Sequence, residues 1–254
     1  MIVNATAVMT PPRSLNWFPA NLEAFNRRFE ERTPEAILRW GLTTFNEDIV
    51  LATGFGPSGV VLMHMVSQIR PQTAVFYLQT DLFFTETLAL RDELRERFDI
   101  NFVEVHSGLS LNEQAFQFGA ALWQRNPDLC CRLRKVNPMR RYLAEKKAWI
   151  TGVRRDQGPS RANTQIVSWD NVNQLIKLSP LATWTREQVW NYIYQNDLPY
   201  NDLHDRGYPS IGCMPCTKAV SDGADERAGR WAEMEKTECG IHIQPDGTVS
   251  RVVR

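Results

Sequence analysis

The sequence predicts an α/β fold built on a mainly parallel sheet flanked by helices. Short apolar runs typical of buried strands alternate with segments whose apolar residues recur at helical spacing. This alternation indicates parallel strands, because parallel neighbours need a crossover connection between them. A glycine-rich turn follows the first strand directly. We expect strands at 48–52, 74–78, 101–105 and 149–151 and helices at 22–29, 33–45, 60–69, 85–98, 111–123, 136–146 and 185–195.

The two ends of the chain differ from its middle. Residues 1–21 contain prolines and no clear period, so we expect a loose N-terminal arm. Residues 22–230 carry the alternating pattern and form the expected α/β domain. Residues 231–254 form the expected mobile C-terminal tail.

Composition excludes several classes of function. The chain has 254 residues, and its 29 basic residues balance its 29 acidic ones. A zero net charge argues against a general nucleic-acid-binding surface. The longest apolar runs are too short to span a membrane, and the first residues lack the pattern of a secretory signal. We therefore expect a cytoplasmic protein, and a homo-oligomer is compatible with the sequence.

Three loops fall at the carboxyl ends of predicted strands, where open α/β sheets bind ligands. The first contains Gly54, Phe55 and Gly56 and leads into a helix, an arrangement that can present backbone N–H groups to an anion. It matches neither a Walker A loop nor a dinucleotide fingerprint. The second contains Thr80. The third, residues 152–161, contains three arginines, whose guanidinium groups suit phosphate or sulfate.

The five cysteines are distributed unevenly. Cys130 and Cys131 are adjacent, Cys213 and Cys216 form a Cys-x-x-Cys pair, and Cys239 stands alone. Four thiolates suit a [4Fe-4S] cluster, and adjacent cysteines reach two irons more readily than one ion. A tetrahedral zinc site is the main alternative, and a redox Cys-x-x-Cys is a weaker one.

Several motifs together resemble one family. They are Cys130-Cys131-x-x-Arg134-Lys135-x-x-Pro138, residues 152–162, residues 203–213 and the tail motif Lys236-Thr237-Glu238-Cys239-Gly240-Ile241-His242. The sequence is similar in these segments to the assimilatory adenylyl-sulfate reductases, the sulfonucleotide reductases that carry a [4Fe-4S] cluster. The similarity extends over roughly 48–242.

This resemblance implies a fold, a reaction and a set of site residues. The fold would be like that of the adenine-nucleotide α-hydrolases, related to the PP-loop proteins. Adenosine 5′-phosphosulfate would be reduced to sulfite and AMP, with thioredoxin or glutaredoxin as reductant. Cys239 would be the nucleophile, and the cluster ligands would be Cys130, Cys131, Cys213 and Cys216. The substrate-binding residues would be Lys135, Arg161, Arg227, Arg230, His242, Gly54, Phe55, Gly56 and Thr80.

Two departures from the family pattern concern the nucleotide. The family's Ser-Phe-Gly loop begins with Gly54 here, and its Leu-Asp-Thr-Gly motif reads Leu78-Gln79-Thr80-Asp81. Relatives without the cysteine pairs prefer 3′-phosphoadenosine 5′-phosphosulfate, so the cysteines favour the unphosphorylated nucleotide. Dual use of both nucleotides is one alternative. Others are a non-catalytic nucleotide sensor with a four-cysteine metal site and an ATP-using ligase or thiolase, the last lacking its expected Ser-Gly-Gly-x-Asp-Ser loop.

Overall fold

The structure is a computed structural model that describes residues 21–221, 223, 225–232, 234, 236 and 238–242. The expected N-terminal arm, apart from Asn21, and all residues after His242 lie outside the described residues. Within the described residues, no helix combines the length and the apolar character that crossing a membrane requires.

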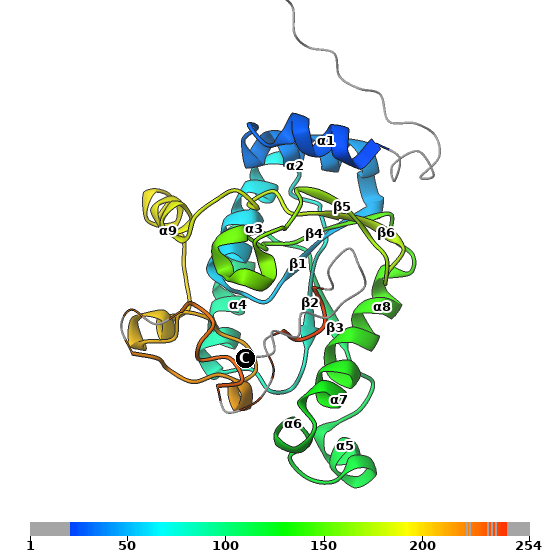
Figure 1. The fold of residues 1–254 in the computed structure, drawn as a ribbon, viewed down its shortest axis with the longest axis vertical. Helices are drawn as coiled ribbons and strands as arrows, with labels where there is room; N and C mark the ends of the chain where they lie inside the picture. The colour runs from blue at the N-terminus through cyan, green and yellow to red at the C-terminus, as the bar shows by residue number, and fades with distance from the viewer. Residues whose placement is uncertain are drawn as a thin grey trace, which may run out of the picture.

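The described residues form a six-stranded sheet whose order is β3-β2-β1-β4-β6-β5 (Figure 1). Every neighbouring pair is parallel except β5 with β6. The prediction of a mainly parallel α/β sheet is confirmed. The strands are β1 (Ile49–Thr53), β2 (Val75–Gln79), β3 (Phe102–His106), β4 (Ala148–Ile150), β5 (Val167–Asp170) and β6 (Leu175–Leu178).

The β5–β6 hairpin was not predicted from the sequence. Each of its strands has only four residues, too few for a convincing period. The turn is held by Asp170, whose Oδ1 accepts hydrogen bonds from the backbone N–H groups of Val172 and Asn173. This hairpin extends the sheet beyond β4 and supplies part of the site described below.

Two apolar cores lie on opposite faces of the sheet. The larger contains buried side chains of α1, α2, α3, α4 and α9, and the smaller joins α8 to the other face. Figure 1 shows α3 and α8 on opposite sides of the strands. The helices are α1 (Leu22–Phe29), α2 (Pro34–Phe45), α3 (Pro57–Ile69), α4 (Thr85–Phe98), α5 (Leu111–Phe118), α6 (Leu122–Arg125), α7 (Pro127–Cys131), α8 (Asn137–Leu143) and α9 (Arg186–Gln195).

Helix starts follow the expected local chemistry. The side chain of Thr33 accepts a hydrogen bond from Ala36 N, with Pro34 in the first turn of α2. Thr185 and Gln188 form a capping box at the start of α9. Observed and predicted bounds agree within three residues for α1–α4 and α9.

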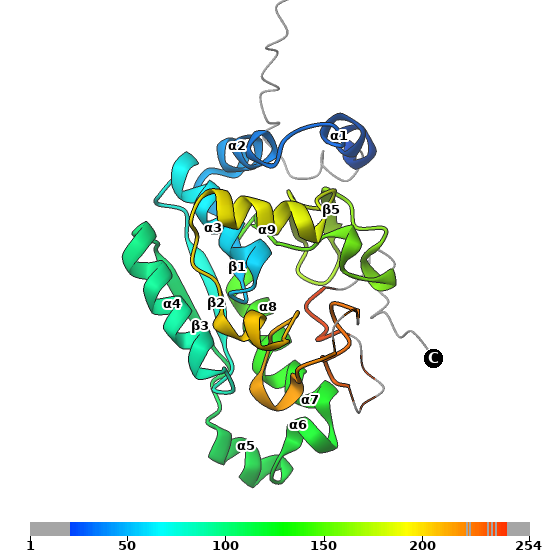
Figure 2. The same cartoon turned by 90° about the vertical axis from the view of Figure 1, so that its left-hand side faces the viewer.

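The predictions for the segment after β3 were wrong in two places. The helix expected at 111–123 is two helices, because Gly119 and Ala121 adopt positive φ angles of 82° and 50° and end the regular hydrogen bonding. The helix expected at 136–146 is α8, and it does not begin separately. A wide π-helical turn, Arg132–Val136, joins the end of α7 directly to the start of α8. Figures 1 and 2 place α5–α7 at the end of the molecule opposite α1 and α2.

Candidate active site

Four buried thiols line one pocket. Cys130 and Cys131 end α7, while Cys213 and Cys216 flank a short 3-10 turn. The pocket is mostly apolar, and Leu82 and Trp123 are among its other walls. All four cysteines are free, and within the described residues no group of three or more His, Cys, Asp or Glu side chains is arranged to hold a metal ion. The lining of this pocket brings together the two cysteine pairs, which are far apart in sequence.

Lys135 and Thr80 lie beside these thiols. Burial lowers the pKa of Lys135, but Cys213, Cys131 and Cys239 outweigh this effect and the net shift is upward. Burial raises the pKa of the Cys213 thiol, but Lys135 and the hydroxyl of Thr80 reverse it, leaving the pKa lowered. The Sγ–Oγ1 distance between Cys213 and Thr80 is 3.4 Å. Thr80 is thus positioned against a thiol as well as at a strand end.

The glycine-rich loop after β1 has an open side and a buried side. A Cβ atom added at Gly54 or Gly56 would meet nothing within 4 Å, so the backbone there is accessible to a ligand. Phe55 instead turns inward with φ of 61° and is 2% exposed, packing against the rings of Tyr77 and Phe83. Its ring belongs to the core, so only its backbone can serve a bound ligand.

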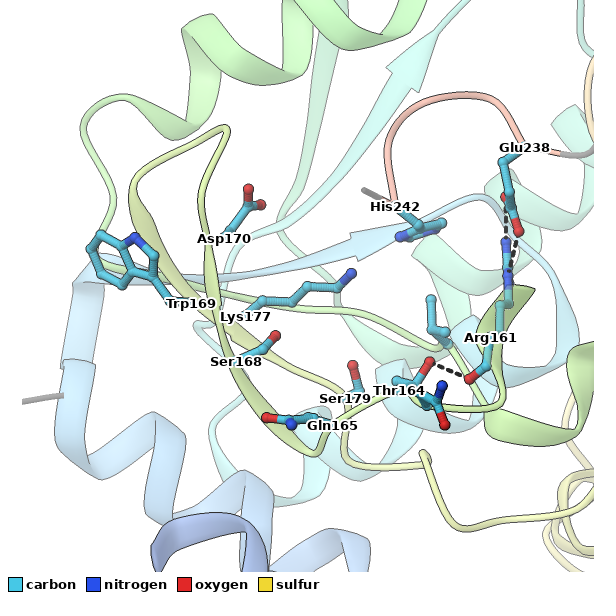
Figure 3. Close-up of a pocket in the computed structure, with 12 residues that line it drawn as sticks. Arg161, Thr164, Gln165, Ser168, Trp169, Asp170, Lys177, Ser179, Glu238 and His242 are labelled. Atoms are coloured by element: carbon cyan, nitrogen blue, oxygen red, sulfur yellow. Dashed lines mark hydrogen bonds and ion pairs between the residues drawn. The ribbon is translucent and has the colours of Figure 1, made fainter. Parts of the chain in front are cut away.

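The three arginines of the 152–161 loop have different partners. Arg154 bonds Ser58 in α3 and pairs with Asp156 and Glu226. Arg155 pairs with Glu30. Arg161, the remaining arginine, points toward the C-terminal tail (Figure 3). Of these arginines, Arg161 is therefore the one with the geometry of a site residue.

The tail residue Glu238 is held by two arginines. Arg161 donates two hydrogen bonds to its carboxylate, from Nε to Oε1 at 2.7 Å and from Nη2 to Oε2 at 2.9 Å (Figure 3). Arg227 donates a third, from Nη2 to Oε2 at 3.2 Å. Burial raises the pKa of Glu238, but the arginines outweigh burial and hold it below its usual range. Glu238 is 3% exposed, so this is a desolvated ion-pair cluster.

The same tail places Cys239 against the thiol pocket. Cys239 is partly buried and packs with the cluster that contains Cys131, Cys213 and Cys216. Gly240 adopts a φ of 81°, a conformation that favours glycine, and the tail turns there past Val136. The tail cysteine and Lys135 are close enough that the thiol contributes to raising the pKa of the lysine.

His242 and Arg230 occupy separate places around this centre. His242 stacks on Trp149 with ring centroids 6.0 Å apart and 9° between the planes. Burial, with Lys177 and the nearby arginines, lowers its pKa well below the usual value, so it is neutral. Arg230 lies over the ring of Trp231, 4.5 Å from its centroid, and its charge contributes to lowering the pKa of Cys213.

Sequence reasoning assigned no individual role to three side chains at this site. Arg134 is 1% exposed and reaches Gln114, Thr80 O and the carboxylate of Asp81. Asp81, which stands where the family pattern has glycine, thus has a partner: it adopts a glycine-like φ of 58° and forms an ion pair with Arg134. Glu238 was named only as part of the tail motif, and Lys177 lies on the hairpin that was not predicted.

A family model of the phosphoadenosine phosphosulfate reductase domain matches residues 48–219, about two thirds of the chain. The chain belongs to the phosphoadenosine phosphosulfate reductase family. An adenosine 5′-phosphosulfate reductase of Salinibacter ruber is 54% identical over 91% of this chain and 92% of its own length. A phosphoadenosine 5′-phosphosulfate reductase of Gloeobacter violaceus is 48% identical over 87% of this chain and 93% of its own length.

Solved structures agree with this family assignment. The phosphoadenylyl-sulfate reductase of Candida auris, in a phosphate complex, superposes with a TM-score of 0.70 at 29% identity, covering 83% of this chain and all of that one. The FMN adenylyltransferase of Candida glabrata superposes with a TM-score of 0.53 at 17% identity, covering 80% of this chain and 68% of that one, which shows a shared fold alone. The expected adenine-nucleotide α-hydrolase-like fold is confirmed.

Proposed function

We propose that this member of the phosphoadenosine phosphosulfate reductase family is an adenosine 5′-phosphosulfate reductase of sulfate assimilation. The observation that carries the proposal is the position of Cys239, packed beside the four-thiol pocket and Lys135 with two arginines at the adjacent residue. Most of the relatives described by name at 44–54% identity are adenosine 5′-phosphosulfate reductases.

The reaction begins at the tail cysteine. The thiolate of Cys239 attacks the sulfur of the sulfate group, the bond from that sulfur to the bridging phosphate oxygen breaks, and AMP leaves. An S-sulfocysteine remains on Cys239. The cationic groups Lys135, Arg227 and Arg230 stabilise the negative charge that gathers on the phosphosulfate oxygens as this bond breaks.

A second protein completes the reduction. A thiolate of thioredoxin, or of glutaredoxin, attacks the Sγ of the modified Cys239 and expels sulfite, leaving a mixed disulfide. The partner's second thiol then releases Cys239 as a free thiol, so both electrons come from the dithiol. The absence of a second cysteine in the motif 236–242 supports a scheme in which the resolving thiol comes from another protein.

The four-thiol pocket is proposed to hold a [4Fe-4S] cluster through Cys130, Cys131, Cys213 and Cys216. Four buried cysteines around a mostly apolar space fit such a group, and so does the adjacency of two of them. A zinc ion bound by the same four thiolates is the alternative. When bound, the cluster supplies fixed geometry and local electrostatics rather than electrons. This chain's own Lys135 remains the cation between that pocket and Cys239.

The test is sulfite release from each nucleotide with thioredoxin supplied. The wild-type protein should release sulfite from adenosine 5′-phosphosulfate, and Cys239→Ser should release none while retaining its metal content and its affinity for AMP. Mass spectrometry should find a sulfonate adduct on the tail peptide of the wild-type protein incubated with substrate alone. Sulfite release by Cys239→Ser would overturn the proposal.

Preference for the 3′-phosphorylated nucleotide is the second candidate, because the Gloeobacter relative is a phosphoadenosine 5′-phosphosulfate reductase. The same assay separates the two, because the ratio of kcat/KM values for the two nucleotides measures the discrimination directly. We expect the ratio to favour adenosine 5′-phosphosulfate.

A further inference from the structure

Every nitrogen atom of the Arg161 guanidinium group already donates a hydrogen bond. Nε and Nη2 donate to the two carboxylate oxygens of Glu238, and Nη1 donates to Gln157 Oε1 at 2.6 Å (Figure 3). A guanidinium group binds an oxyanion best along an edge formed by two of its nitrogens. Glu238 takes one such edge of Arg161, and Gln157 takes a nitrogen of the other. Arg161 therefore has no edge left for a second oxyanion while Glu238 is in this position.

Two further guanidinium groups share the charge of this region. Arg227 Nη2 donates to Glu238 Oε2 at 3.2 Å. Burial, followed by the charges of Arg161 and Arg230, lowers the pKa of Arg227 to about 10, although Glu238 opposes this shift. Arginines gathered in a desolvated place repel one another and need an anion between them. The carboxylate of Glu238 is the anion that the docked tail supplies to Arg161 and Arg227.

The phosphosulfate group of the substrate is a second anion for the same cations. In the proposed function, Arg227 and Arg230 stabilise the charge of this group. A sulfate presents a pair of oxygen atoms to a guanidinium edge in the same way as a carboxylate does. Two anions held side by side in a buried site repel each other strongly. The contacts of Glu238 and those of the phosphosulfate group are therefore mutually exclusive.

We propose that Glu238 is an internal competitor of the substrate: the docked tail places its carboxylate on arginines that the phosphosulfate group binds, and the nucleotide must displace it. This inference rests on the proposed function. The exchange keeps Arg161 and Arg227 paired with a negative charge throughout. Because Cys239 directly follows Glu238 in the chain, the exchange also couples substrate binding to movement of the nucleophile. Glu238 is thus a positioning residue, which acts on the substrate through the two arginines.

The first experiment compares two nucleotides that carry no sulfate. ADP has a β-phosphate where adenosine 5′-phosphosulfate has its sulfate, whereas AMP ends at the α-phosphate. Both are titrated calorimetrically into the purified full-length protein. Removing a competitor raises the apparent affinity by the fraction of sites that it occupied, so Glu238→Gln should bind ADP at least about tenfold more tightly than the wild-type protein. Its affinity for AMP should change by less than about twofold, because AMP has no group that replaces the sulfate.

Glu226→Gln is the matched control. Glu226 pairs with Arg154 and not with the arginines that hold Glu238, so this variant removes the same charge from the same part of the chain. The ratio of the AMP and ADP dissociation constants should stay close to that of the wild-type protein. Thermal unfolding of each variant checks that the fold is intact. If Glu238→Gln unfolds, Glu238→Asp takes its place; it keeps the charge but is one methylene shorter, and it should tighten ADP binding by a smaller factor.

The second experiment uses the substrate itself. Sulfite release from adenosine 5′-phosphosulfate is measured with thioredoxin supplied, over a range of substrate concentrations. Glu238→Gln should lower KM several-fold, because the substrate no longer has to displace a carboxylate. A residue with a purely structural role would not lower KM when it is replaced.

Three results would overturn the proposal. They are an ADP affinity of Glu238→Gln that is unchanged or weaker, an AMP affinity that rises as much as the ADP affinity, and a rise in KM. Failure of the proposed function would look different: ADP and AMP would bind with the expected ratios, and the wild-type protein would release no sulfite.

Discussion

Replacing Glu238 with glutamine should release the C-terminal tail from its docked position. The change keeps the size of the side chain and one acceptor oxygen but removes the charge that Arg161 and Arg227 share. Breaking a buried pair by removing one partner costs about 3–5 kcal/mol. The tail can undock and let water reach the arginines, so we expect docking to weaken by about 2–3 kcal/mol. At about 1.36 kcal/mol per tenfold change, this is roughly 30- to 160-fold in the docked-to-undocked ratio.

The assay is the rate of maleimide modification of Cys239 in the purified full-length protein without substrate, measured by peptide mass spectrometry. Glu238→Gln should react much faster than the wild-type protein, and Glu145→Gln, at an exposed position, should not. Because the folded pKa of Glu238 is lowered, its contribution to docking is complete at neutral pH and is lost only as the pH falls through that lowered pKa. A rate within twofold of wild type would refute the argument that this carboxylate holds the tail.

Three further outcomes follow from the described contacts. Arg134→Met should destabilise the protein by about 3–5 kcal/mol in chemical denaturation, because it leaves Asp81 and buried acceptors without their partner; Asp81→Asn, which keeps the arginine, should cost less. Burial lowers the pKa of His204 to about 4, so the free energy of unfolding should fall as the pH drops from about 6.5 to about 4. His204→Gln should make the free energy of unfolding less dependent on pH in this range, as measured by chemical denaturation at a series of pH values. An unchanged pH dependence would exclude this histidine as its source. Ser110→Ala should cost about 1 kcal/mol by removing the capping box of α5, and thermal unfolding with no measurable loss would contradict it.

The parallel part of the fold could be predicted because its signals are local. Long amphipathic helices and caps such as Thr33 define their own bounds, and apolar runs between them leave few positions for strands. The segment from 111 to 143 was harder. Ala121 adopts a positive φ, which cannot be predicted from the residue type because alanine rarely does so. The π-helical turn before α8 has no distinctive composition.

The candidate site, like the fold, could be predicted from the sequence only in part. The cysteine pairs and Cys239 stand out by residue type and spacing, and the structure brings them together. Glu238 and Lys177 could not be assigned roles from sequence, because charged residues are common and their meaning depends on burial. Glu238 gains its role only in the folded chain, where Arg161 and Arg227, which belong to different segments, both donate hydrogen bonds to its carboxylate. The roles of the predicted substrate-binding residues remain predictions.

The π-helical turn at Arg132–Val136 constrains the number of residues that can join α7 to α8. It sits between the paired cysteines at the end of α7 and the core-packed side chains of α8. An α-helix rotates by about 100° for each residue, so deleting one residue here would restore ordinary winding and swing Cys130 and Cys131 round the axis. Both thiols would then face away from Cys213 and Cys216 while α8 stayed in place. We therefore expect this stretch to accept changes of side chain far more readily than a change in its number of residues.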